Sequence, residues 1–257
     1  MLNSKNKTQT ILIVEDTKMN AKLLFDVLKE LKRSVRIVKV YNGEEALKVL
    51  NKTEFDLILL DIILPGISGY ELIELLKDHP KNSSTPVIFI SSLKDEIKGL
   101  KLGAVDYITK PFKKEEVLAR AKTQLELKEA KDIIEEENES LKALFENGTE
   151  PIVLYDNQLN FLKANEKFKM LFKYDISELK GRNIREVVLE ISKKKVSNRA
   201  IRDILSGKQV EIEAVRYTKT GRKVNCLIKG IPIQLRGNFK GVYVMYVNIT
   251  ELKRKEE

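Results

Sequence analysis

Five short apolar runs, each separated from the next by an amphipathic segment, constrain the fold of the first half of the chain. They read TILIV, VRIVKV, FDLILL, PVIFIS and VDYIT and occupy residues 10–14, 35–40, 55–60, 86–91 and 105–109. The segments between them have the apolar spacing of helices and cover residues 18–32, 43–51, 69–78 and 94–102. Strands that alternate with helices form a parallel sheet covered on both faces. We therefore expect residues 8–122 to form an α/β doubly wound, five-stranded parallel sheet.

A second feature is the helical character of residues 113–146, which contain neither Gly nor Pro and are rich in Glu, Lys, Leu and Ala. This composition predicts one long connecting helix that overlaps the last helix of the first domain. Leu127, Ile134 and Leu141 lie seven residues apart, which is typical of a short coiled coil, although Glu137 interrupts the companion positions. A solvated spacer helix is the alternative.

Beyond this helix the pattern changes to a mixture of strands and short helices. Two short strands at 151–156 and 160–164 precede helices that we expect at 165–172, 177–180, 184–190 and 195–206. Three long strands then follow at 209–218, 223–235 and 239–249, where VEIEAV and VYVMYV alternate as half-buried antiparallel strands do. Residues 140–250 are therefore expected to form an α+β domain with an antiparallel sheet. Residues 251–257 are expected to begin an outgoing helix, with Thr250 as its N-cap.

Polar and charged residues follow the buried strands of the first domain at their carboxyl ends. Glu15 and Asp16 follow the first strand, Asp61 the third, Ser91 ends the fourth and Lys110 follows the fifth. Carboxyl ends of parallel strands meet at one edge of the sheet. Carboxylates placed together repel one another unless a cation lies between them, and Mg²⁺ prefers such oxygen ligands. This set suits phosphoryl transfer, with Asp61 as the nucleophile and with the ammonium and hydroxyl groups of Lys110 and Ser91 contacting phosphoryl oxygens.

The motifs VED, LLDIILPGISGYEL, PVIFISS and GAVDYITKPF, in this order within residues 10–125, resemble a response-regulator receiver domain of flavodoxin-like fold. By this resemblance Asp61 accepts a phosphoryl group, and Mg²⁺ or Mn²⁺ is held by Glu15, Asp16, Asp61 and the backbone carbonyl of Ile63. The resemblance further implies that Lys110 contacts the phosphoryl group, that the Lys110–Pro111 bond is cis, and that Ser91 and Tyr107 form the switch.

The same resemblance implies that two further positions tune hydrolysis of the phosphoryl group. They lie two residues beyond Asp61 and two beyond Ser91, where this chain has Ile63 and Leu93. Neither side chain can orient a water molecule by hydrogen bonding. We therefore predict slow loss of the phosphoryl group. The single histidine, His79, is expected to be a surface residue at a helix end with a structural role.

The stretches LFENGTEPIVLYDNQLNFLKANEKFKMLFKYDISELKGRNI and GVYVMYVNITELK resemble a PAS domain, which implies a sensor or dimerisation module. The region holds no histidine that could ligate haem. Cys226 lies in a predicted strand instead of the helical motif of a photoactive flavin domain, so we expect a buried, small apolar residue. We expect a packed core without a bound cofactor, and a small organic molecule is the alternative. Asn248-Ile249-Thr250 stands where the family has Asp-Ile-Thr, so an acidic anchor for the outgoing helix is missing.

The formal net charge of +9 would suit nucleic acid or anionic lipid if it were concentrated on one surface. The basic residues are instead scattered among acids, and the densest run, Lys193 to Lys195, is expected to be a solvated helix face. We expect no nucleic-acid partner. One cysteine excludes an internal disulfide and fits a reducing compartment. No apolar run approaches the roughly 20 residues of a membrane helix, so we expect a cytoplasmic protein without a membrane segment.

Together these features predict a response regulator of two-component signal transduction. A histidine kinase or a histidine phosphotransfer protein would phosphorylate Asp61, and the helix at 113–146 would relay the change to the PAS domain within a homodimer. The chain would not be an enzyme, although the receiver would assist its own Mg²⁺-dependent phosphorylation and dephosphorylation. Two alternatives stay open. The chain could be the regulatory N-terminal part of a larger enzyme, such as a diguanylate cyclase or hybrid sensor kinase, or an interaction scaffold that is never phosphorylated.

Overall fold

A computed structural model describes residues 8–31, 34–92, 96–192 and 198–256 of the chain. The chain divides into two compact units, Met1–Glu136 and Glu137–Glu257, which are described separately below. The predicted tuning residue Leu93 and the lysine run Lys193 to Lys195 lie outside the described residues. No helix in the described ranges is long and apolar enough to cross a membrane.

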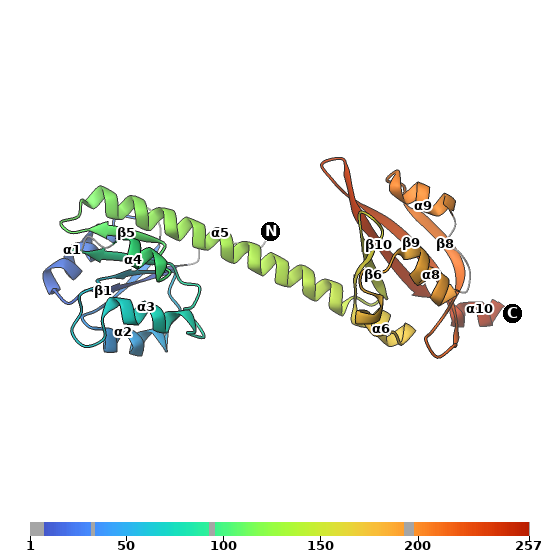
Figure 1. Cartoon of the computed structure of the whole chain (residues 1–257), viewed down its shortest axis with the longest axis horizontal. Coiled ribbons are helices and arrows are strands. Elements are labelled where there is room, and N and C mark those ends of the chain that lie inside the picture. The colour runs from blue at the N-terminus through green and yellow to red at the C-terminus, as the bar shows by residue number, and fades with distance from the viewer. Residues whose placement is uncertain (1–7, 32–33, 93–95, 193–197, 257) are drawn as a thin grey trace. The chain divides into compact units, whose positions relative to one another are not determined.

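The first unit is built on a five-stranded parallel sheet with the strand order β2-β1-β3-β4-β5, which confirms the predicted doubly wound fold (Figure 1). The strands are β1 (Gln9–Val14), β2 (Val35–Val40), β3 (Leu57–Leu60), β4 (Val87–Ser91) and β5 (Asp106–Thr109). The helices are α1 (Lys18–Leu28), α2 (Gly43–Leu50), α3 (Gly69–Lys77), α4 (Glu96–Lys101) and the first part of α5 (Lys114–Asn147). The predicted elements are thus present, with most ends shifted by one to four residues.

Two apolar cores lie on opposite faces of this sheet, because successive side chains of a strand point to opposite sides. All four residues of β3 are buried, as expected for a strand that is covered on both faces. Ile58 and Leu60 belong to the core that includes residues of α2 and α3. Leu57 and Leu59 belong to the other core, which includes residues of α1 and α5. Figure 1 shows the two helix layers on either side of the sheet.

The prediction for His79 was wrong in one respect, because the side chain is buried and not on the surface. Only 8% of the residue is exposed, and Nδ1 accepts hydrogen bonds from the backbone N–H groups of Lys81 and Asn82. Nε2 lies 3.1 Å from Oδ1 of Asn51. The ring therefore satisfies backbone donors of the turn after α3, a structural role that depends on where the turn folds back.

The second unit contains a five-stranded antiparallel sheet with the order β7-β6-β10-β9-β8, again as predicted (Figure 1). The strands are β6 (Ile152–Asp156), β7 (Phe161–Ala164), β8 (Val210–Tyr217), β9 (Lys223–Leu235) and β10 (Asn238–Asn248). Helices α6 (Glu166–Phe172), α7 (Ile176–Leu179), α8 (Ile184–Ser192) and α9 (Asn198–Leu205) contribute apolar residues to a single core against one sheet face. Positive φ angles at Gly221 and Gly237 allow the turns of the two long hairpins.

One buried side chain, Asn165, joins the end of α5 to the start of this domain. Its amide Nδ2 donates to the backbone oxygens of Phe145 and Glu150 at 3.1 and 2.8 Å. Its Oδ1 accepts from the N–H groups of Ile152 and Phe168 at 2.9 and 3.1 Å, and the second of these bonds caps α6. Asn165 is fully buried. Its side chain therefore replaces water as the hydrogen-bond partner of backbone groups in α5, β6 and α6.

The predicted outgoing helix is present as α10 (Thr250–Glu256), but Thr250 is not its N-cap. Thr250 is the first helical residue, and its hydroxyl oxygen accepts a hydrogen bond from the backbone N–H of Asn225 in β9 at 2.9 Å. The side chain of Asn248 instead accepts from the N–H of Thr250 at 3.0 Å. The Thr250 hydroxyl thus binds a neighbouring strand, in a contact between residues that are far apart in the sequence.

Candidate functional site

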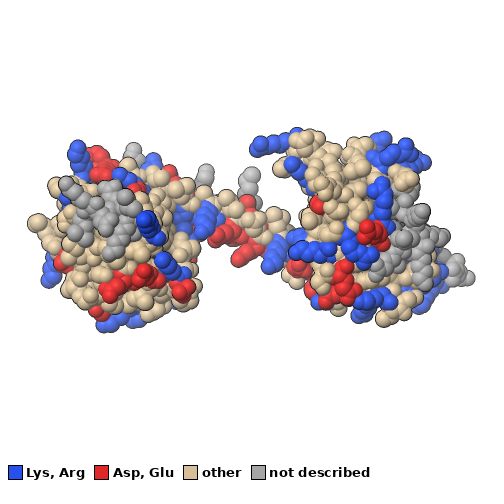
Figure 2. Space-filling model, viewed as in Figure 1, with Lys and Arg blue, Asp and Glu red and all other residues tan. Residues whose placement is uncertain are grey.

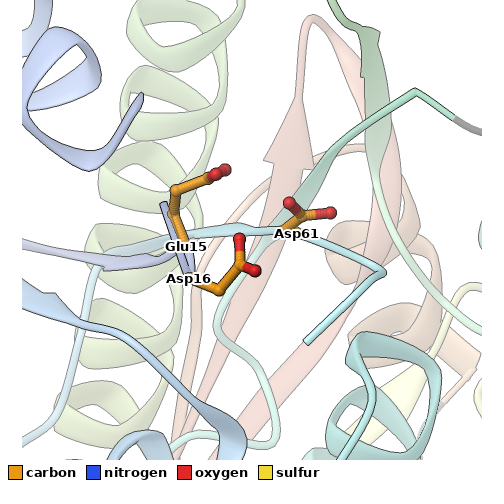
Figure 3. Close-up of side chains that lie close together, drawn as sticks. All are labelled: Glu15, Asp16 and Asp61. Atoms are coloured by element: carbon orange, nitrogen blue, oxygen red, sulfur yellow. The ribbon is translucent and has the colours of Figure 1, made fainter. Parts of the chain in front are cut away.

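Three carboxylates meet at the carboxyl ends of β1 and β3. Each of Glu15, Asp16 and Asp61 offers an oxygen, and these oxygens all lie within 4.8 Å of one another. Figure 3 shows the three side chains gathered at this edge of the sheet. Glu15 and Asp61 are buried, whereas Asp16 is exposed, so the cluster is open to solvent on one side.

The backbone of the sheet positions these side chains. Strands β1 and β3 pair in parallel up to Val14 and Leu60, and the N–H of Asp61 donates to the backbone oxygen of Val14 at 2.9 Å. On the other side of β1, the N–H of Glu15 donates to the oxygen of Val40 in β2 at 3.1 Å. Because strands β1 and β3 end at the same level of the sheet, the acidic residues that follow them are neighbours.

Lys110 brings an ammonium group to two of these acids. Its Nζ lies 2.5 Å from Oδ2 of Asp61 and 2.7 Å from Oε2 of Glu15, and its side chain is 18% exposed. The backbone N–H of Lys110 donates to the oxygen of Ser91 at 2.9 Å, which ties the end of β5 to the end of β4. The Lys110–Pro111 peptide bond is cis, as predicted.

Burial and charge act together on the pKa values of Glu15 and Lys110. Burial raises the pKa of Glu15, and the nearby negative charge of Asp61 adds to this effect, while hydrogen bonds from Lys110 and Asn20 oppose it. For Lys110, burial alone would lower the pKa. The hydrogen bonds to Asp61 and Glu15 and the charges of these two acids outweigh burial, so the pKa of Lys110 is raised. Lys110 therefore carries its positive charge at neutral pH.

Two contacts within the site were not predicted from the sequence. The Asn20 side chain, in the first turn of α1, donates to Oε1 of Glu15 at 2.9 Å. The backbone N–H of Ile63 donates to Oδ1 of Asp61 at 3.0 Å, while Ile63 itself is 53% exposed. Both oxygens of Asp61 are thus held, Oδ1 by a backbone N–H group and Oδ2 by Lys110. The position of Asn20, five residues after Glu15 at the start of a helix, is the sequence signal that could have identified it.

The two predicted switch residues lie on the neighbouring strands. Ser91 is the last residue of β4 and is fully buried. Tyr107 lies in β5, pairs with Phe89 and is buried in the apolar core on the side of α2 and α3. The structure places both residues one or two strands away from Asp61 in the same sheet. Their switching roles stay predictions.

The donor set of this site fits a hard divalent cation. Three carboxyl groups share this edge of the sheet with a single ammonium, so the acidic groups outnumber the basic one and favour a bound cation. Carboxylate oxygens are the ligands that Mg²⁺ prefers, and an open side suits an ion that keeps several water molecules. Glu15, Asp16 and Asp61 are therefore the described residues that would hold the ion.

Comparisons with known proteins agree with both halves of this description. Residues 11–122 match the family model of the response regulator receiver domain, and residues 149–251 match that of the PAS domain. Over 136 residues the chain is 39% identical to a probable cyclic di-GMP phosphodiesterase of Vibrio cholerae, covering 52% of this chain and 30% of that protein. It is 38% identical over 134 residues to the regulatory protein VanR of Enterococcus faecium, covering 51% of this chain and 56% of VanR.

Among solved structures, the receiver domain of the Francisella response regulator 1452 is 30% identical, with a TM-score of 0.43, and the match covers 46% of this chain and 98% of that one. The chain spans less than two thirds of the length of the two curated relatives named above.

Proposed function

The chain carries a response regulator receiver domain over residues 11–122 followed by a PAS domain over residues 149–251, and from this we propose that Asp61 receives a phosphoryl group in a two-component system. Receiver domains obtain this group from histidine kinases or histidine phosphotransfer proteins, and we propose a donor of one of these two kinds. The observation that supports the proposal most directly is the contact of Lys110 with Asp61 and Glu15 beside the open Asp16 carboxylate.

In the proposed reaction the Asp61 carboxylate is the nucleophile. One of its oxygens forms a bond to phosphorus while the P–N bond of a phosphohistidine breaks, and the histidine ring of the donor leaves with the electron pair of that bond. The N–H of Ile63 holds Oδ1 and the ammonium of Lys110 holds Oδ2, so the carboxylate is fixed before the donor arrives. Lys110 would then move its contact to a phosphoryl oxygen and neutralise the charge that develops there.

A bound Mg²⁺ or Mn²⁺ would supply further positive charge for the phosphoryl oxygens, and Glu15, Asp16, Asp61 and the backbone carbonyl of Ile63 are the groups proposed to hold it. Asn20 orients Glu15 by its hydrogen bond, so that the second oxygen of Glu15 faces Lys110. Ser91 and Tyr107 are proposed to respond to the phosphoryl group, and α5 to relay that response to the PAS domain. The relay requires that phosphorylation favour one of two arrangements of these groups by differential contacts.

We further propose that the chain works as a homodimer joined along α5. Leu127, Ile134 and Leu141, here named the heptad stripe, are 58%, 58% and 64% exposed, although they are apolar residues of a mostly charged helix segment. A seven-residue apolar repeat suits a second helix of the same kind. The stripe runs into a groove of about 330 Å³ whose lining includes Leu141, Leu144, Ile231 and Tyr243, which extends the apolar surface onto the PAS sheet.

Phosphorylation of the full chain with acetyl phosphate tests the central proposal. The wild-type chain should gain one phosphoryl group in Mg²⁺ or Mn²⁺ and none in EDTA, as measured by intact mass. Asp61→Asn should gain none, because the nucleophilic carboxylate is gone. Asp78→Asn, which changes an exposed acid at the end of α3, is the matched control and should react like wild type. A wild-type chain that gains no phosphoryl group would favour the scaffold alternative.

The similarity to a probable cyclic di-GMP phosphodiesterase favours one second candidate, the regulatory N-terminal part of a longer enzyme. In that case the receiver and PAS domain would control a catalytic domain encoded further along the gene. The DNA that follows codon 257 distinguishes the two proposals. An open frame that leads into a catalytic domain would support the enzyme, and a stop codon would support a separate regulator.

A cytoplasmic location and the absence of a nucleic-acid partner stay predictions. Figure 2 shows acidic and basic side chains interspersed over the drawn face of each unit.

A further inference from the structure

The core of the PAS domain contains a buried arginine. Arg216 lies near the end of β8, and only 7% of the residue is exposed. It pairs with Val224 of β9, which is fully buried in the apolar core between the sheet and the helices. Among the described residues of Glu137–Glu257, Arg216 is the one buried residue with a charged side chain. A cation in such a position needs an acceptor, because burial removes the water that would otherwise solvate it.

The described part of the chain supplies no acid to this cation. Nη1 donates to the backbone oxygen of Val215, in the neighbouring residue, at 2.9 Å. Nε is buried and has no hydrogen-bond partner, and no described carboxylate forms an ion pair with the guanidinium. An arginine side chain presents five N–H donors in a planar fork, which matches the two oxygens of a carboxylate. The Nε donor of this fork is unused.

The titratable groups on which the charge of Arg216 acts include no acid that could be its counter-ion. Its positive charge acts on Tyr155, Tyr246 and Cys226, whose side chains are all buried in the same core. Burial raises the pKa of Tyr246 to about 12 and that of Cys226 to about 11, and it raises the pKa of Tyr155 well above its ordinary value. All three are therefore neutral at physiological pH. The Tyr155 hydroxyl lies near Tyr246 but makes no hydrogen bond of good geometry.

We propose that the PAS core binds a small organic acid, whose carboxylate pairs with the guanidinium of Arg216 and accepts a hydrogen bond from the Tyr155 hydroxyl. A carboxylate fits better than phosphate, because its single charge is less costly to desolvate and its two oxygens match the planar fork. This binding does not depend on phosphorylation of Asp61, so the two proposals can fail separately.

The packing of the core limits the size of the acid. The rings of Phe168, Phe172 and Tyr246 lie in contact, with centroids 4.8 Å apart for Phe168 and Phe172 and 5.2 Å apart for Phe172 and Tyr246. A group as large as haem or flavin would have to separate these rings. A short acid with an apolar body can lie against them while its carboxylate meets Arg216.

Calorimetric titration of the full chain tests the proposal. The probes are sodium formate, acetate, propionate, butyrate and benzoate, with sodium phosphate and sodium chloride at matched ionic strength. At least one acid should bind with a stoichiometry of one per chain, and phosphate should not bind. Arg216→Met should weaken that binding by about tenfold or more, since it removes a charged hydrogen-bond donor. Arg216→Lys keeps the charge without the fork and should bind more weakly than wild type. Arg222→Met, which removes an exposed arginine in the turn before β9, should bind like wild type.

Thermal unfolding without acid supplies a second readout. Arg216→Met should unfold at the same temperature as wild type or higher, because it replaces an unpaired buried charge with an apolar side chain. A lower unfolding temperature would identify the guanidinium as a structural group and would overturn the proposal. It would also be overturned if none of the five acids bound to the wild-type chain, if phosphate bound instead, or if Arg216→Met bound the acid with unchanged affinity.

Discussion

At the scale of single residues, a small number of groups hold the reactive carboxylate of the candidate site in place. The carboxylate of Asp61 is held from one side by the N–H of Ile63 and from the other by Lys110, which also contacts Glu15. The raised pKa of Lys110 keeps its positive charge in place across the physiological pH range. The acid that would be phosphorylated is thus already oriented and neutralised, and its exposed neighbour Asp16 leaves the approach from solvent open.

The side chain of Ile63 provides a test of how long the phosphoryl group would last. Because it is half exposed beside Asp61 and cannot hold a water molecule, Ile63→Asn should speed loss of the phosphoryl group about tenfold, which corresponds to a barrier lower by about 1.4 kcal/mol. The measurement is the decay of phosphoryl-Asp61 after the phosphodonor is removed. Ile63→Val is the control and should decay like wild type. A wild-type lifetime of seconds, or equal decay in Ile63→Asn, would contradict the prediction.

Cys226 allows a test of burial in the PAS core, because it is the single cysteine of the chain. The residue is fully buried, and burial raises the pKa of its thiol to about 11. The thiol is protonated below that pH, and only the thiolate reacts with alkylating agents. We expect the native chain to resist iodoacetamide at about pH 8, whereas the urea-unfolded chain should react fully, as measured by mass. Equal rates in both states would show that the thiol is accessible.

At the scale of secondary-structure elements, the important feature is where each element ends. The receiver strands end at one edge of their sheet, which brings the acids together, and α3 begins with a capping box between Ser68 and Glu71. At the other end of α5, Asn165 binds the backbone of the helix, of β6 and of α6 at once. If α5 relays the signal as proposed, these hydrogen bonds are the contacts through which its last turn meets β6 and α6.

Removal of the Asn165 side chain should therefore destabilise the second unit strongly. Asn165→Ala leaves buried backbone donors and acceptors without partners, which we expect to cost about 3 kcal/mol of the free energy of unfolding. Urea unfolding followed by circular dichroism measures this change. Asn165→Asp keeps the accepting oxygen but places a buried carboxylate against the carbonyl oxygens of Phe145 and Glu150, so it should destabilise the unit at least as much as alanine. Asn157→Ala, in the exposed turn between β6 and β7, should be nearly neutral; a comparable loss there would argue against a special role for Asn165.

At the scale of the whole molecule, the chain joins a domain that would receive a signal to one that would sense or dimerise. The two units are compact in themselves, and one continuous helix, α5, contributes residues to both. Its heptad stripe is exposed along the part of the helix that leaves the receiver core. Phosphorylation could change the output by changing how two such helices associate.

The oligomeric state provides the test at this scale. Light scattering of the full chain should detect a dimer, and beryllofluoride with Mg²⁺ should change the dimer–monomer equilibrium. Ile134→Glu should weaken dimerisation by about tenfold or more, because it would bury a charge between two helices. Ile134→Leu should preserve the dimer. Glu139→Ala, another exposed position of α5, is the control for a surface change. A wild-type chain that stays monomeric with and without beryllofluoride would refute the proposed homodimer.

Much of the fold could be predicted from the sequence, because it depends on local periodicity. The runs with both faces apolar identified the parallel strands, and the alternating runs identified the antiparallel sheet. The acids at the strand ends could be predicted as a group for the same reason, since parallel strands with known ends place their next residues side by side. The contact of Lys110 with Asp61 and Glu15 follows from that arrangement.

Other features were decided only by the tertiary structure. His79 was expected at the surface and is buried, Thr250 was expected to cap a helix and bonds to Asn225, and nothing in the local pattern distinguished Asn165 or Arg216 from other polar residues. The partners of Thr250 and most of those of Asn165 lie far away along the chain, and His79 meets the distant Asn51 as well as the backbone of its own turn. Local periodicity reports which way a side chain points, but hydrogen-bond satisfaction depends on which distant groups the folded chain brings within reach.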